Sequence, residues 1–371
     1  MKNKRIGFAL LCAFAVTAIS CFNLFDRPDN DEETYLNITL PGSIGRTAVS
    51  TTELTGMRYE ITLTGPGGTI KKTLGNGETR LSEKVLPGAW KIAVRAFYDG
   101  ADQGVPGWHT GQLRGAVNTS VNVSLGQTAP VPVHLKTVTG ASNWTELEDA
   151  ITNALDGDFV MLEADIEYGF PSGTTITPPS SATVTLLADG DREIARSTSV
   201  ALFNLTNSDS TLILGDPLVP GTLALNGGGL SAIISLIEIA DTSYVPSAKV
   251  IMNNNVIVRN SVTTTAAPTV NIFGGTFEMN GGAITGNTTG AGVVKIQAAG
   301  FFQMNGGSIS GNTGDGVYVD ATGGTFSWSS GNISGNTVQV TSTAGDLIGW
   351  ELGWNSYVSG VSPCPNNGDG T

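Results

Sequence analysis

Carboxylates are the side chains of this sequence best suited to chemistry, and eight of them lie between residues 156 and 193. Glycoside hydrolysis needs two carboxyl groups about 5–9.5 Å apart, one of which donates a proton. The eight acids fall near predicted turns, where a carboxylate more often serves solvation than catalysis. They are Asp156, Asp158, Glu163, Asp165, Glu167, Asp189, Asp191 and Glu193.

Metal and thiol chemistry has few residues to draw on, because the chain contains two histidines and three cysteines. A calcium-dependent lyase would need a carboxylate cluster beside an arginine or lysine base. Arg259 and Lys295 are the bases of the repetitive region, and no acid cluster accompanies them. We therefore predict no catalytic residue, no metal ligand and no cofactor.

Cys21 is predicted to carry a covalent modification. Lys2, Lys4 and Arg5 precede an apolar run over residues 6–19, which has the length of a secretory signal and is too short to span a bilayer. The run ends Ala18-Ile19-Ser20-Cys21, which resembles a relaxed bacterial lipobox. The resemblance implies diacylglycerol on the Cys21 thiol and an acyl chain on its amine, together a stable membrane anchor. An ordinary signal peptide cut elsewhere is the alternative.

The net charge argues against polyanionic partners. The formal net charge is −13, and removing residues 1–20 takes away three cations and no acids, which gives −16. Such a surface repels nucleic acids and anionic membranes, so neither is predicted to bind it.

The elements that position these side chains follow from one phrase written three times between Val270 and Asn336. Its aromatic residues, Phe277, Phe302 and Phe326, recur at a nearly constant interval of about 25 residues. That period indicates a solenoid; propeller blades need about 40–45 residues, and the leucine-rich frame is absent. Apolar and polar residues alternate within each phrase, as in a strand with one buried face. The pattern predicts three parallel strands per turn, a parallel β-helix.

Several columns of matching residues are predicted along this coil. Glycine at two corners supplies positive φ, and an asparagine follows the second corner in every copy. A degenerate copy precedes them, in which Met252, Ile257 and Asn260 stand at one constant offset before Met279, Ile284 and Asn287. The predicted columns are Ile284/Ile309/Ile333 and Val317/Val338 inside, Asn271/Lys295/Tyr318/Gln339 outside, and Asn287/Asn312/Asn336 at the corner.

At these residues the chain resembles the right-handed β-helix family with the pectin-lyase-like fold. More narrowly, it is similar to bacterial surface lipoproteins with repeated F-x-M-N-G-G-x-I-S-G-N-T coils. The strong match covers the three phrases from Val270 to Asn336, and a weaker one reaches back to about residue 140. The fold hosts polysaccharide lyases and hydrolases, which raises the question of activity without answering it.

A short helix is predicted to cap the first coil. Asn143 with Glu146 three residues later matches a capping box, followed by apolar residues at helical spacing. The predicted inward residues are Trp144, Leu147, Ala150, Ile151, Ala154 and Leu155.

The preceding segment predicts about seven short strands in about 100 residues, typical of an immunoglobulin-like sandwich. Apolar residues alternate with polar ones along these strands and are predicted to face inward. They include Trp90 and, near the end of the segment, Val121, Val123 and Leu125. Leu86-Pro-Gly-Ala-Trp90 resembles a hairpin of carboxypeptidase-regulatory-like modules, and Trp108 and His109 in a glycine-rich loop are candidate partner contacts. In similar lipoproteins such a sandwich acts as a spacer.

The predicted fold class is all-β: a sandwich, then a right-handed parallel β-helix with a capping α-helix. The predicted segments are a signal peptide at 1–20, an acidic tether at 21–33, the sandwich at 34–136, the β-helix at 137–345, and an aromatic cap with a disordered tail at 346–371.

The leading functional hypothesis is a non-catalytic protein, lipid-anchored in the bacterial cell envelope at the outer membrane or cell surface. Its rod would bind a glycan or a host or envelope protein, with Phe301 and Tyr318 as outward aromatics able to stack on sugars. Packing against a neighbouring loop is the plainer interpretation of both. The alternatives are a polysaccharide lyase or glycoside hydrolase, and a purely structural surface component.

Overall fold

The part of the chain that the structure describes is all-β apart from one short helix. The computed structural model describes residues 33–40, 43–44, 47–48, 55–75, 77–101, 110–168, 175–242, 246–263, 267–343, 346–349 and 358–359. The predicted signal peptide, Cys21, nearly all of the tether, Trp108, His109 and most of 346–371 lie outside these ranges. Within them the predicted all-β class is confirmed.

The described residues between 33 and 135 form two facing sheets. The first has the order β6-β1-β9 and the second the order β5-β4-β7-β8. Strand β1 pairs with β6 antiparallel and with β9 parallel. The strands are β1 (Tyr35–Thr39), β4 (Met57–Gly65), β5 (Gly68–Leu74), β6 (Arg80–Lys84), β7 (Gly88–Tyr98), β8 (Gln112–Val123) and β9 (Thr128–Pro132), with a small hairpin of β2 (Ser43–Ile44) and β3 (Thr47–Ala48).

Side chains from both sheets share one core, because apolar residues alternate along the strands as predicted. Trp90 is 1% exposed, and its Nε1 donates to the Leu86 carbonyl over 2.8 Å. A Cβ at Gly65 would lie 2.5 Å from the Trp90 ring, so only glycine fits there. Leu125 was predicted to face inward and is 64% exposed, because β8 ends at Val123 and Leu125 lies in the following turn.

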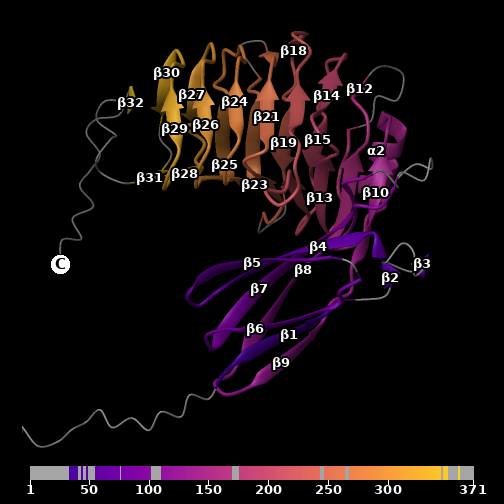
Figure 1. Ribbon diagram of the computed structural model, residues 1–371. Helices are drawn as coiled ribbons and strands as arrows, with labels where there is room; N and C mark the ends of the chain where they lie inside the picture. The colour runs from indigo at the N-terminus through magenta and orange to yellow at the C-terminus, as the bar shows by residue number, and fades with distance from the viewer. Residues whose placement is uncertain are drawn as a thin grey trace, which may run out of the picture.

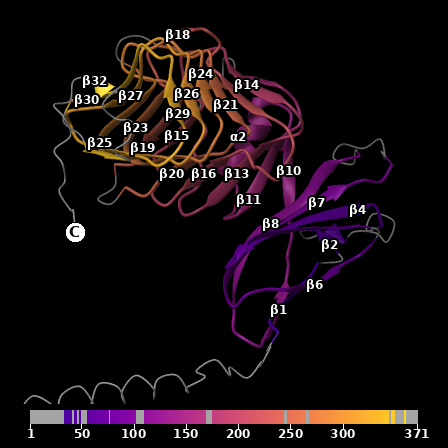
Figure 2. The ribbon, with the colours of Figure 1, turned by 60° about the vertical axis from the view of Figure 1, so that its left-hand side comes forward.

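From residue 136 onward the described strands stack in parallel ladders, which lie in a row across Figure 1 and are turned by 60° in Figure 2. The first ladder holds nine strands in the described residues, each paired in parallel with the next. They are β10 (Lys136–Ala141), β11 (Asp158–Leu162), β13 (Thr183–Ala188), β16 (Thr211–Leu214), β20 (Lys249–Met252), the second halves of β23 (Val270–Met279) and β25 (Val294–Met304), β28 (Thr325–Trp328) and β31 (Asp346–Gly349).

Two further ladders run beside the first, again with parallel pairing throughout. The second ladder is β12 (Ile166–Tyr168), β14 (Arg192–Arg196), β17 (Leu223–Asn226), β21 (Val256–Arg259), β24 (Ala283–Thr285), β26 (Ser308–Ser310) and β29 (Asn332–Ser334). The third ladder is β15 (Phe203–Leu205), β19 (Ile237–Ala240), the first halves of β23 and β25, β27 (Asp315–Val319), β30 (Val338–Ser342) and β32 (Val358–Ser359). A separate short pair, β18 (Ser231–Ala232) with β22 (Val262–Thr263), lies at a corner.

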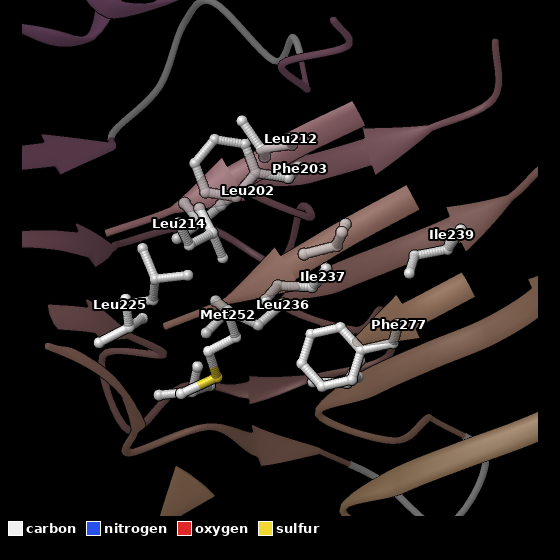
Figure 3. Close-up of a cluster of buried hydrophobic side chains, with 14 of the residues drawn as sticks. Leu202, Phe203, Leu212, Leu214, Leu225, Leu236, Ile237, Ile239, Met252 and Phe277 are labelled. Carbon is white, nitrogen blue, oxygen red and sulfur yellow. The ribbon is translucent and has the colours of Figure 1, made fainter. Parts of the chain in front are cut away.

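The three ladders enclose one continuous apolar interior. Phe277 pairs in register with Phe302, and Phe302 with Phe326. Their ring centroids are 5.4 and 5.0 Å apart, and all three side chains are fully buried. Figure 3 shows how side chains from all three ladders point into this interior. Those labelled include Leu212 and Met252 from the first ladder, Leu225 from the second, and Phe203 and Ile237 from the third.

Two predicted columns are wrong in register. Val258, not Ile257, pairs with Ile284. The corner after Met252 is one residue longer than the corner after Met279, and a one-residue shift in a strand exchanges its two faces. Ile257 therefore points outward, and Asn260 does not continue the asparagine column; the backbone N–H of Ser261 bonds the Asn287 side chain instead.

The second error lies at β30. Val338 pairs with Asp315, while Val340 pairs with Val317 and Thr341 with Tyr318. Gln339 is thus not stacked on Tyr318. Its side chain lies at the corner, where its Oε1 accepts a 3.1 Å hydrogen bond from the Asn336 Nδ2.

The asparagine column is confirmed. Asn287 Nδ2 donates to Asn312 Oδ1 over 3.0 Å, and Asn312 Nδ2 donates to Asn336 Oδ1 over 2.8 Å. Each asparagine also donates to a backbone carbonyl one turn away, and all three are buried. The column therefore supplies hydrogen-bond partners for backbone N–H and C=O groups at the corner that have none from strand pairing.

The predicted capping helix is present as α2 (Trp144–Thr152), and its buried residues belong to the core inside the ladders. Asn143 Oδ1 accepts from the Glu146 N–H over 3.0 Å, and the Glu146 carboxylate accepts from the Ser142 N–H over 2.8 Å. Leu155 was predicted to face inward but is 69% exposed, because α2 ends before it and the chain turns into β11.

The two-sheet unit and the ladders meet at a buried ion pair. Arg95 on β7 donates through Nε to Asp216 Oδ2 over 2.8 Å, and the two side chains are 2% and 6% exposed. The Arg95 guanidinium lies 5.0 Å from the Phe159 ring centroid. Strand β8 also pairs with β10, so the second sheet runs directly into the first ladder.

Replacing Asn312 with alanine tests the asparagine column. The change leaves the Asn287 N–H and the Ile284 carbonyl without their partners in a buried corner. We expect a loss of about 2–4 kcal/mol in the free energy of unfolding, measured by denaturant titration. Asn280→Ala is the control, because it removes a similar asparagine–asparagine bond where water can replace it. Equal losses in the two variants would contradict a role for the buried column.

Candidate functional site

A shallow cavity of about 430 Å³ lies on the outer face of the second ladder. We call it the Glu193 cleft. Glu193, Ala224 and Ile257 occupy matching outward positions on three successive strands. The small Ala224 side chain between two larger neighbours leaves the hollow. The cleft is lined by Asp165, Asp191, Arg192, Glu193, Thr222, Ala224, Ile257 and Arg259.

The two aspartates of the cleft hold neighbouring strands together. Asp165 Oδ1 accepts from the Glu193 N–H over 2.9 Å, and Asp191 Oδ1 accepts from the Thr222 N–H over 3.0 Å. In each pair the carboxylate lies at a corner and the N–H belongs to the next turn. Within the described residues the second oxygen of each carboxylate makes no hydrogen bond, so it can accept one from a ligand.

Glu193 joins three strands of the second ladder. Its Oε1 accepts from Asn226 Nδ2 over 2.8 Å and its Oε2 from Arg259 over 2.6 Å. The Arg259 and Glu193 side chains are 45% and 25% exposed, so the pair contributes at most about 1 kcal/mol to stability. Arg192 adds a second guanidinium, whose Nε has no partner among the described residues.

A second cavity of about 240 Å³ lies where the two-sheet unit meets the ladders, and Asp191 lines both cavities. Its other walls are mainly apolar or backbone. They come from Phe97, Leu113, Met161 and Val219, and from the corner residues 188–190 and 220–221.

The aromatics predicted from the sequence as binding residues lie elsewhere. Phe301 is half-buried on the first ladder between Thr276 and Thr325. Tyr318 is half-buried on the third ladder, with the Lys295 ammonium 5.7 Å from its ring centroid. The two rings therefore lie on different ladders and line neither cavity. Cys21, the predicted lipid attachment, lies outside the described residues.

Sequence reasoning singled out three of the cleft acids but did not gather them with Arg192 and Arg259. The matching positions Glu193, Ala224 and Ile257 are unequally spaced along the chain, and both intervals are longer than those of the regular repeats. No fixed period therefore indicates the register there. The available signal was the alternation of side chains between the two strand faces within Leu223–Asn226 and Val256–Arg259.

Metal-ligating side chains do not cluster in the described ranges. No group of three or more histidine, cysteine or acidic side chains is placed to hold a metal ion there. Desolvation raises the pKa of the Glu238 carboxyl, but Glu238 lies on the third ladder between Asn204 and Asn271, away from the cleft. Within the same ranges no helix has the length and apolar character that crossing a bilayer requires.

Comparison with protein-family models, with curated proteins and with solved structures finds no match for this chain.

Glu238 provides a pH-dependent test of this placement. Its pKa is raised in the folded state, so its contribution to stability is complete below the unfolded value of about 4.3 and is lost as pH rises through the folded value. We expect Glu238→Gln to remove that loss, so that its stability exceeds that of the wild type increasingly as pH rises. Denaturant midpoints between about pH 4 and pH 8 measure the difference. The exposed Glu167→Gln is the control, and a wild type that follows the Glu238 variant at every pH would contradict the prediction.

Proposed function

We propose that this protein is a non-catalytic, lipid-anchored component of the bacterial cell envelope that binds carbohydrate in the Glu193 cleft. In this proposal the ladders are a right-handed parallel β-helix of the pectin-lyase-like kind, and the two facing sheets are an immunoglobulin-like spacer. Parallel pairing of each repeated phrase with the next supports the β-helix. The signal-like N-terminus with Cys21 supports the anchor.

The chemistry of the cleft carries the binding proposal. Sugar hydroxyls both donate and accept hydrogen bonds, and the cleft offers carboxylate acceptors beside guanidinium donors. Asp165 and Asp191 each keep one oxygen for a ligand, and Ile257 supplies an apolar side chain against which a sugar face can pack. Three carboxylates and two guanidiniums leave a small negative charge, which favours a neutral glycan over a polyanionic one.

A polysaccharide-degrading enzyme is the second candidate, because three carboxylates line one cleft. Against it, the observed bonds of all three join neighbouring strands. Catalysis by a carboxyl pair needs one member that is protonated near neutral pH. Desolvation raises the pKa of one described carboxyl, that of Glu238, and Glu238 lies on another ladder.

Glycan binding to the full chain tests the cleft. A glycan array would identify a neutral oligosaccharide, and calorimetry would measure its affinity. We expect Asp191→Asn to weaken binding about 10–100-fold, because it replaces a charged acceptor while keeping an oxygen for the Thr222 N–H. Asp149→Asn, exposed on α2, is the matched control and should bind normally. Reducing ends or unsaturated uronates released from a polysaccharide panel would favour the enzyme, and silence in both assays would leave a purely structural role.

Metabolic labelling tests the anchor. We expect the chain to incorporate labelled palmitate and to partition into the membrane fraction, and Cys21→Ala to lose both properties, because the thiol and its neighbouring amine carry the acyl groups. Cys364→Ala is the matched control and should retain both. An unlabelled wild type released in soluble form would indicate an ordinary signal peptide.

A further inference from the structure

Arg196 is a buried cation without a carboxylate partner among the described residues. It ends β14 and lies in the inward-facing column with Ile194, 1% exposed. Its Nη1 donates to the carbonyls of Ile234 and Ser235 over 3.0 and 3.4 Å. Its Nε and Nη2 are buried and have no hydrogen-bond partner in the described part of the chain.

The guanidinium of Arg196 cannot become neutral by releasing a proton. Burial lowers the pKa of Arg196, but arginine starts so far above neutrality that it stays protonated. An unpaired buried ion costs several kcal/mol, and each unsatisfied donor adds to that cost. Either a compensating anion or a rearrangement is therefore needed to keep the side chain inside.

Further unpaired hydrogen-bonding groups lie next to Arg196. Tyr168 is its register partner on β12 and is fully buried, and its hydroxyl makes no hydrogen bond to any described residue. The Tyr168 ring packs on Trp144, with centroids 4.0 Å apart, and the Trp144 indole N–H is likewise buried without a partner in the described chain. Arg196, Tyr168 and Trp144 thus each carry at least one buried donor for which the described chain supplies no acceptor.

We propose that a small monovalent anion of the halide class, such as chloride, binds inside the stack against the Arg196 guanidinium and the Tyr168 hydroxyl. The anion is small because Arg196 and Tyr168 are almost completely closed off from solvent and lie against the apolar interior. It is monovalent because one cation is to be balanced and each additional buried charge is costly. Since the binding site exists only in the folded chain, the anion stabilises the fold by mass action.

Thermal unfolding of the full chain tests the site, with sodium chloride compared with sodium gluconate at equal ionic strength. Gluconate is too large for the closed interior. We expect Tm to be about 2–4 °C higher in chloride, the difference to vanish in Arg196→Met, and to shrink in Tyr168→Phe. Arg80→Met is the matched control, because this arginine is exposed and its loss should preserve the chloride effect.

Crystals grown in sodium bromide provide an independent measurement. An anomalous peak within hydrogen-bond distance of Arg196 Nε supports the proposal, and water at that position overturns it. Equal wild-type Tm values in the two salts also overturn it. If Arg196→Met does not fold, the bromide density and Tyr168→Phe still decide the question.

Discussion

Parallel register between successive turns is the constraint on which the rest of the structure depends. Side chains alternate between the two faces of a strand, so a slip by one residue would expose a whole inward column. In the regular repeats the inward-facing Phe, Met and Ile side chains lie on counterparts in the next turn, such as Phe277 on Phe302. The buried asparagine column fixes the same register at the corner, because the Asn287 and Asn312 amides each bond the turns on both sides.

The Arg95–Asp216 pair extends this order to the two-sheet unit. Every nitrogen of the Arg95 guanidinium has a partner: Asp216, Asn118 or the carbonyls of Val94 and Val117. A satisfied buried pair fixes orientation more than it adds stability, because desolvation offsets much of the attraction. Apolar residues from both units surround it, and β8 pairs with β10, so the junction is defined by strand pairing as well as by charge.

The regular turns could be predicted almost residue by residue because a repeated phrase reveals its own register. Phe277, Phe302 and Phe326, the three asparagines and the N-cap at Asn143 all lie where the pattern predicts. Prediction failed where a corner changes length by one residue, as at Ile257, since spacing then no longer identifies the face. The site was only partly predictable. Its acids could be named individually, but the pairing of Glu193 with Arg259 joins strands that are far apart in the sequence, with another strand of the same ladder between them.

Irregular corners also explain why the Glu193 cleft and the buried Arg196 both lie among the earlier turns of the second ladder. Along the second ladder, the chain between inward partners is longer from Ile194 to Leu225 and from Leu225 to Val258 than from Ile284 to Ile309. Short identical corners place outward residues beside their equivalents, as Asn305 is bonded to Asn280. Longer corners allow different polar groups to meet. Glu193 thus pairs with Arg259, and Arg196 donates to the Ile234 backbone carbonyl. The cleft and the buried arginine therefore lie where the repeat is least exact, while the exact repeats form the regular part of the stack.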